Sequence, residues 1–368
     1  MNKVAENTRI TYSQLSTFSK CARKAELEYE YGIRRTEESR AMRRGTIFHE
    51  GMNALWTEKG DCGGILNSHW NDWEDSEWHV VMTQLYALLA AYRQHYIASG
   101  QHKDISVLEV EEVFDVDGHL DMRYSGKKDK VVSRNGKALL VEHKSVGDSV
   151  DISPGSDYQR RLYFDEQISY YLIASQRADK PLDGVMYDIT KMPSTKPKEL
   201  TQEYTKILME TGEYRVAMKD PDEIVTVGRF EWQQDEETNE VFITPEDSHC
   251  ELATQVEHKK MNTIIETPNM YLARLVAEIS RRPERYFQRV VLTRRGGQIA
   301  AAGINLTNKL KNLHAARRYG WWPQSTSFCL IGGKCPCFEL CATGFDPATE
   351  DVLPEGYIQV DNIHQELE

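Results

Sequence analysis

The spacing of apolar residues divides the first half of the chain into helical and extended segments. Helical periodicity is found in residues 10–32, 79–98 and 160–178. Extended segments are predicted in residues 106–116, 118–124, 136–145 and 183–190. In one of these strands the apolar run Leu139–Val141 leads directly into charged residues. This order of elements predicts an α/β fold with a central mixed β-sheet flanked by helices.

The pattern loosens in the second half. Residues 190–280 are rich in polar and acidic side chains and predict an insertion, a small helical subdomain. A strand and a long helix are expected between residues 286 and 318. Residues 344–368 are expected to form an acidic, weakly structured tail. The expected organisation is a single domain over residues 1–343, followed by that tail.

Charge changes this picture only once its position is considered. The 368 residues carry a net charge of −12, which argues at first against a nucleic-acid partner. Residues 344–368 hold seven acidic side chains and residues 233–258 hold eight, with no Lys or Arg in either segment. The rest of the chain is therefore at +3, and residues 281–320 contain ten Lys or Arg against one acid. A basic surface beside two acidic segments is compatible with DNA binding.

The apolar runs also bear on location. None approaches the roughly 18 to 20 residues that cross a bilayer, and the first residues lack the apolar stretch of a secretory signal. We expect a cytoplasmic protein without a membrane partner. In that compartment cysteines stay reduced, so the dense group near the C-terminus indicates a metal site and not a set of disulfides.

Candidate chemistry concentrates between residues 118 and 144. Asp121 lies near the start of one predicted strand, and Glu142 and Lys144 lie two residues apart at the end of another. Residues two apart on a strand point to the same side, so both should face whatever Asp121 faces. Two carboxylates at a sheet edge suit Mg²⁺ or Mn²⁺, and the ammonium group suits the orientation of an attacking water.

These residues resemble the motifs of a known family. GHLD at 118–121 and LLVEHK at 139–144 are similar to the second and third motifs of the PD-(D/E)XK nuclease superfamily, in particular its RecB-like exonuclease branch. GTIFHE at 45–50 resembles the first motif, which implies that His49 is a metal ligand with Asp121 and Glu142. Gln167 and Tyr171 resemble the fourth motif, whose residues contact DNA near the scissile phosphate.

The cysteines extend the resemblance to iron–sulfur members of that branch, which include exonucleases of CRISPR adaptation. In these, one cysteine before the first motif and three near the C-terminus hold a [4Fe–4S] cluster. The matching residues here are Cys21, Cys329, Cys335 and Cys341. Cys337 is surplus and is an alternative to Cys335. Four of the five thiols would also suit a structural Zn²⁺ ion.

The resemblance implies a metal-dependent DNA exonuclease that acts on single-stranded DNA or DNA ends in recombination or repair, beside a separate helicase. Two alternatives stay open: a non-catalytic iron–sulfur subunit that binds DNA ends, and a structure-specific endonuclease. A basic set is expected to contact the DNA backbone without reading bases. Its members are Arg281, Arg282, Arg285, Arg289, Arg294 and Arg295.

Overall fold

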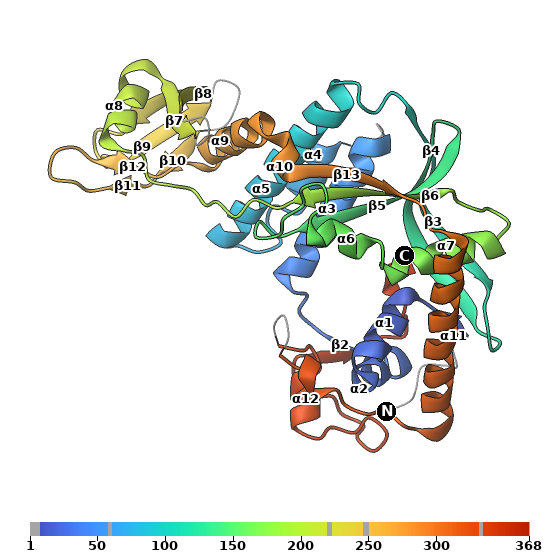
Figure 1. The fold of residues 1–368 in the computed structure, drawn as a ribbon. Helices are drawn as coiled ribbons and strands as arrows, with labels where there is room; N and C mark the ends of the chain where they lie inside the picture. Colours follow the sequence, from blue (N-terminus) through green and yellow to red (C-terminus); the bar gives the residue numbers. More distant parts are fainter. Residues whose placement is uncertain (1–7, 58–60, 219–222, 246–249, 331–333, 368) are drawn as a thin grey trace.

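The protein is described from a computed structural model that covers residues 8–57, 61–218, 223–245, 250–330 and 334–367. A mixed six-stranded sheet forms its centre (Figure 1). Its strands are β1 (Arg9–Ile10), β3 (Ile105–Asp117), β4 (Arg123–Arg134), β5 (Lys137–Val146), β6 (Gly184–Lys191) and β13 (Phe287–Leu292). The order is β1-β4-β5-β6-β13, with β3 also paired to β4. The predicted α/β fold with a central mixed sheet is confirmed.

The pairing within this sheet is set by one tight turn and one crossover. Asn135 and Gly136 both have positive φ, as a two-residue hairpin turn requires, and they join β4 to β5 in antiparallel register. β5 then pairs with β6 in parallel through the helices that lie between them in sequence. All eight residues of β6 are buried, as expected for a strand inside a sheet that helices cover on both faces.

Helices cover both faces of the sheet, and alternate residues of β5 enter two different cores. Leu139 and Val141 pack into the core under one group of helices: α3 (Arg40–Thr57), α4 (Cys62–Ser68), α5 (Ser76–Tyr92) and α9 (Pro268–Arg281). Leu140 packs on the other side. The helices there are α1 (Tyr12–Lys20), α6 (Asp157–Leu162), α7 (Glu166–Arg177) and α11 (Gly296–Tyr319). Because strand residues alternate, Glu142 and Lys144 lie on the α7 side and His143 on the α5 side.

The insertion is built mainly from strands, which corrects the predicted helical subdomain. It contains α8 (Gln202–Thr211), β7 (Glu213–Met218), β8 (Glu223–Gln234), β9 (Val241–Pro245), β10 (Glu251–Ala253), β11 (Gln255–Val256) and β12 (Thr263–Ile264). β7 to β10 form an antiparallel sheet that projects from the central sheet in Figure 1. It has its own core, which includes Leu208, Tyr214 and Phe230.

The C-terminal segment folds against the N-terminal helices. α12 (Phe338–Ala342) and β14 (Tyr357–Gln359) lie beside α2 (Ala22–Ala25), the π-helix Glu26–Glu30 and β2 (Ile33–Arg35), and β14 pairs with β2. The remaining helical elements are short. They are the π-helix Arg93–Ala98 after α5, α10 (Pro283–Tyr286) and two 3-10 turns, Thr326–Phe328 and Gln365–Leu367. Ile363 and His364 are buried. The segment expected to be a weakly structured tail is thus a packed part of the fold.

None of the helices in the described part of the chain is both long enough and apolar enough to cross a membrane.

Candidate active site

The end of β5 brings two charged side chains to one place. Glu142 is 5% exposed, and its Oε1 accepts a hydrogen bond from Lys144 Nζ at 2.7 Å. Lys144 Nζ also lies 3.5 Å from Asp165 Oδ2 and 3.4 Å from Gln167 Oε1. One ammonium group therefore joins the strand to the start of α7.

The second carboxylate beside Glu142 is Asp129, not Asp121. The β4–β5 register pairs Lys130 with Val141, and one further step along both strands places Asp129 next to Glu142. Asp129 Oδ2 accepts a hydrogen bond from the His143 backbone N–H at 3.1 Å. The same oxygen lies 3.6 Å from His49 Nδ1, which α3 supplies.

The prediction for Asp121 is corrected by its position in the fold. Asp121 is exposed in the turn before β4 and has positive φ. β4 begins at Arg123, six residues before Asp129, which is about 20 Å along a strand. The sequence contained a signal for Asp129, because the Asn135-Gly136 turn fixes the hairpin register. Counting back from that turn pairs Asp129 with Glu142.

The other predicted residues of this site are brought together. Gln167 Nε2 donates a hydrogen bond to Tyr171 Oη at 3.1 Å, as expected for residues four apart on α7. Gln167 also contacts Lys144, so these two α7 side chains extend the group formed by His49, Asp129 and Glu142. Asp165, which caps α7, was not predicted from the sequence.

Burial sets the protonation of these groups. It raises the pKa of Glu142 to about 7, against the lowering effect of Lys144 and with a further increase from Asp129. Burial also lowers the pKa of Lys144, but the Glu142 and Asp165 carboxylates outweigh it and the net pKa is raised. The pKa of His49 is lowered, chiefly by burial, which keeps its imidazole neutral and able to ligate a metal. Two carboxylates and a neutral imidazole are a donor set that fits Mg²⁺ or Mn²⁺.

The donor set is not closed around a metal position. Among the described residues, no group of three or more His, Cys, Asp or Glu side chains is arranged to hold a metal ion. At the end of β5 the side chains contact one another in pairs: Lys144 pairs with Glu142, and His49 lies beside Asp129. A divalent cation held by His49, Asp129 and Glu142 would add positive charge beside the two carboxylates.

His143 faces a separate buried network on the other side of β5. Its Nε2 lies 3.1 Å from Lys130 Nζ and its Nδ1 lies 3.3 Å from Asp188 Oδ2. Arg289 Nε donates to the other Asp188 oxygen at 3.1 Å, and its guanidinium lies over the Tyr96 ring. Arg289 is thus turned into the fold and is not available to the DNA backbone, which corrects that prediction.

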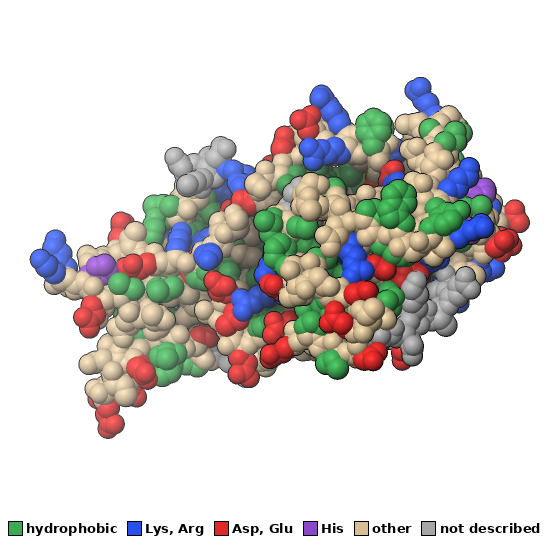
Figure 2. Space-filling view, turned by 90° about the horizontal axis from the view of Figure 1, so that it is seen from below, with side chains coloured by type: hydrophobic (Ala, Val, Ile, Leu, Met, Phe, Trp, Pro, Cys, Tyr) green, Lys and Arg blue, Asp and Glu red, His purple; other side chains and the backbone are tan. Residues whose placement is uncertain are grey.

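Three of the remaining predicted arginines bond to other residues of the protein, Arg294 to the backbone and Arg281 and Arg285 to acidic side chains. Arg294 donates hydrogen bonds to the backbone carbonyls of Leu162 and Asp165, so the prediction that Arg294 contacts the DNA backbone is also corrected. Arg281 pairs with Glu223 and Arg285 pairs with Asp148. Figure 2 shows basic and acidic side chains interspersed over one face, without a broad basic half. The remaining predicted members, Arg282 and Arg295, are partly buried and exposed, respectively.

Arg281, Arg282 and Arg285 line a cavity of about 300 Å³ between the insertion and the core. Lys198, Arg274 and the acidic Glu278 line it as well, so basic side chains outnumber acidic ones on its wall.

The four predicted cysteine ligands lie near one another between the N- and C-terminal segments. Ser325 contacts both Cys21 and Cys329, through its N–H at 3.5 Å and its carbonyl at 3.9 Å. Burial raises the pKa of Cys341, and Cys21, Cys335 and Cys329 are close enough to raise it further. Cys337 is buried with Leu27 and Leu340, and its Sγ lies 4.0 Å from Glu28.

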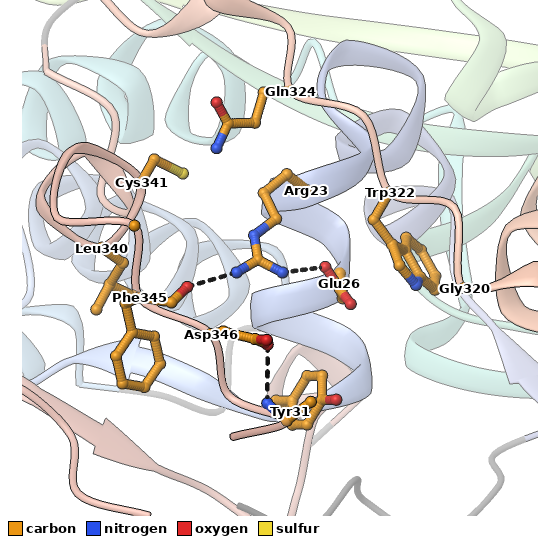
Figure 3. A pocket seen from close by; sticks show the side chains of 12 residues that line it. Arg23, Glu26, Tyr31, Gly320, Trp322, Gln324, Leu340, Cys341, Phe345 and Asp346 are labelled. Atoms are coloured by element: carbon orange, nitrogen blue, oxygen red, sulfur yellow. Dashed lines mark hydrogen bonds and ion pairs between the residues drawn. The ribbon is translucent and has the colours of Figure 1, made fainter. Parts of the chain in front are cut away.

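A cavity of about 540 Å³ opens beside these cysteines, and Cys341 lies on its wall (Figure 3). Arg23 reaches across it and donates to the Phe345 carbonyl at 2.6 Å and to the Glu26 carboxylate. This contact ties the N-terminal helices to the segment after α12.

Comparison with known families agrees with this geometry. The model of the PD-(D/E)XK nuclease superfamily matches residues 9–341, from β1 to α12. The chain belongs to the PD-(D/E)XK nuclease superfamily. Membership makes it a metal-dependent nuclease, for which divalent cations such as Mg²⁺ or Mn²⁺ are the cofactors and DNA is the substrate. A comparison with curated proteins gives no match.

Proposed function

We propose that this PD-(D/E)XK nuclease is a DNA exonuclease that hydrolyses single-stranded DNA or DNA ends in recombination or repair. The observation that carries the proposal is the position of Lys144, which lies 2.7 Å from Glu142 and beside Asp165 and Gln167. Burial of the Glu142 carboxylate is unfavourable for folding and is expected only where the carboxylate has a function. We therefore favour an enzyme over a non-catalytic end-binding subunit.

The roles of the residues follow from their chemistry. His49, Asp129 and Glu142 would hold the divalent cation, which lowers the pKa of a bound water and offsets charge on the phosphate. Because the pKa of Lys144 is raised, its ammonium stays protonated. Lys144 therefore orients the attacking water and donates hydrogen bonds to the phosphate oxygens instead of accepting a proton. Gln167 and Tyr171 would position the DNA strand.

The basic cavity supports a second part of the proposal. Arg281, Arg282 and Arg285 line it with Lys198, and we place backbone phosphates of the substrate along this surface, with Arg295 at the start of α11. The sequence has no Gly-Lys-Ser/Thr phosphate-binding loop. Unwinding of long duplexes would therefore require a separate helicase.

The cysteines are proposed to hold a [4Fe–4S] cluster through Cys21, Cys329, Cys335 and Cys341. The neighbouring Cys337 thiol lowers the pKa of Cys335 to about 6, while the pKa of Cys337 is raised. A thiolate at Cys335 and a buried thiol at Cys337 favour Cys335 as the ligand. The same four thiols would bind Zn²⁺, so metal analysis of anaerobically purified protein decides between them.

The nuclease proposal is tested with end-labelled linear and circular single-stranded DNA in Mg²⁺ or Mn²⁺. Wild type should shorten linear strands and leave circles intact, and Lys144→Ala should stop cleavage while DNA binding persists. Lys137→Ala, an exposed lysine on the same strand, is the control. Cleavage of circles would show an endonuclease, and equal activity of wild type and Lys144→Ala would contradict the catalytic assignment.

A further inference from the structure

Two aromatic side chains stand exposed in the turn between α6 and α7. Phe164 is 81% exposed and Tyr163 is 47% exposed. Single exposed apolar residues are common on protein surfaces, so exposure alone carries no function. The location of this pair beside the candidate active site is what makes it informative.

The backbone of this turn is held from beneath. The Tyr187 hydroxyl donates to the Leu162 carbonyl at 3.2 Å, and Arg294 donates to the same oxygen at 2.7 Å and to the Asp165 carbonyl at 3.3 Å. The Phe164 N–H closes the turn on the Arg161 carbonyl at 2.9 Å. These bonds fix both ends of the turn, so the two rings are presented outward by a supported backbone.

The same turn adjoins the residues at the start of α7 that contact Lys144. Phe164 is followed by Asp165, whose carboxylate lies 3.5 Å from Lys144 Nζ, and three residues after Phe164 comes Gln167, which contacts the same ammonium. Consecutive Cα atoms are about 3.8 Å apart, so the Phe164 backbone directly adjoins Asp165, a residue that contacts Lys144. Arg160 and Arg161, both exposed, precede the pair and suit a phosphodiester backbone.

We propose that Phe164, assisted by Tyr163, is a stacking platform for an unpaired base next to the scissile phosphate. The inference rests on the proposed nuclease function and deepens it by naming the substrate that the site selects. Every base has a π-face, so stacking on an exposed ring is tolerant of sequence. A base inside a duplex is already stacked and paired and does not reach the ring, so the platform favours unpaired nucleotides.

The test is a double-mutant cycle between the ring and the base. Lys144→Ala protein, which is expected to bind DNA without cutting it, is titrated with labelled single-stranded oligonucleotides in Mg²⁺. Each oligonucleotide carries one abasic position, which is moved stepwise from the end. At one or two adjacent positions, base removal should weaken binding about 5- to 150-fold with Phe164 present. It should have little effect in Phe164→Ala or in Phe164→Leu, which keeps an apolar side chain but lacks the π-face.

Tyr319→Ala is the matched control, because this aromatic side chain is 73% exposed at the far end of α11. It should leave the effect of each abasic position unchanged. A 5-iodouracil base at the sensitive position should crosslink to residues 163–164 on irradiation. If ring and base losses are additive at every position and no crosslink forms there, the platform is refuted while the nuclease proposal stands. If wild type cuts no DNA but ring and base are coupled, the platform holds and the nuclease proposal fails.

Discussion

Burial of Glu142 predicts that the metal-free protein loses stability as the pH rises. The folded pKa is about 7, above the ordinary value of 4.5, and burial is the main cause. Because folding favours the protonated carboxyl, this stabilisation is fully present below pH 4.5 and is lost as the pH rises through about 7. The difference between these two pKa values corresponds to about 3 kcal/mol in the free energy of unfolding.

Replacement of Glu142 by Gln isolates this contribution from those of other titrating groups. Gln resembles the protonated carboxyl in size and charge, so the variant should lack this part of the pH dependence. Urea unfolding with a chelator, followed by tryptophan fluorescence, should give the two proteins similar stability near pH 5. Near pH 8.5 the variant should be more stable by about 3 kcal/mol.

The same pair of proteins links stability to metal binding. Mn²⁺ should stabilise wild type at pH 8.5, because the cation binds only the folded carboxylates. It should have much less effect on Glu142→Gln. The reasoning is refuted if chelated wild type is as stable as the variant near pH 8.5, or if its stability relative to the variant increases with pH.

Three further outcomes follow from the positions of single residues. Asp129→Asn should lower DNA cleavage by about 100-fold or more, since it removes a metal ligand, whereas Asp121→Asn should cleave like wild type in the same assay. For the proposed [4Fe–4S] cluster, Cys335→Ser should abolish the visible absorption of anaerobically purified protein and Cys337→Ser should keep it; the reverse would make Cys337 the ligand in place of Cys335. Arg289→Ala should cost about 3 to 5 kcal/mol in urea unfolding, because it removes the arginine partner of the buried Asp188 carboxylate, and a loss below 1 kcal/mol would contradict that.

Local periodicity accounts for the parts of the site that were predicted from the sequence. Glu142 and Lys144 share a side because strand residues alternate, and Gln167 meets Tyr171 because helix residues four apart are neighbours. Asp129 was missed because its role depends on pairing between strands. The Asn135-Gly136 turn determines that pairing, so the error lay in using GHLD as the guide in place of the hairpin register.

The direction of the basic side chains depends on contacts that are distant in sequence. Arg289 turns inward because β13 pairs with β6 and places it opposite Asp188, about one hundred residues earlier. Nothing local to residues 281–295 indicates this partner. The insertion was misjudged for a related reason, since its core forms only when β7 to β10 pair with one another. Composition reported the charge of these segments correctly but not which side chains solvent or DNA can reach.

Asp165 explains how one lysine serves the site with and without a cation. Lys144 Nζ donates a hydrogen bond to Glu142 Oε1 at 2.7 Å, and Glu142 is also a proposed ligand of the divalent cation. A cation that takes Glu142 would leave Lys144 with Asp165 at 3.5 Å and Gln167 at 3.4 Å, both from the start of α7. That second set of partners keeps the ammonium charged and in place when the first is withdrawn. Because Arg294 and Tyr187 hold the backbone before Asp165, the turn that presents Phe164 also holds the lysine in position.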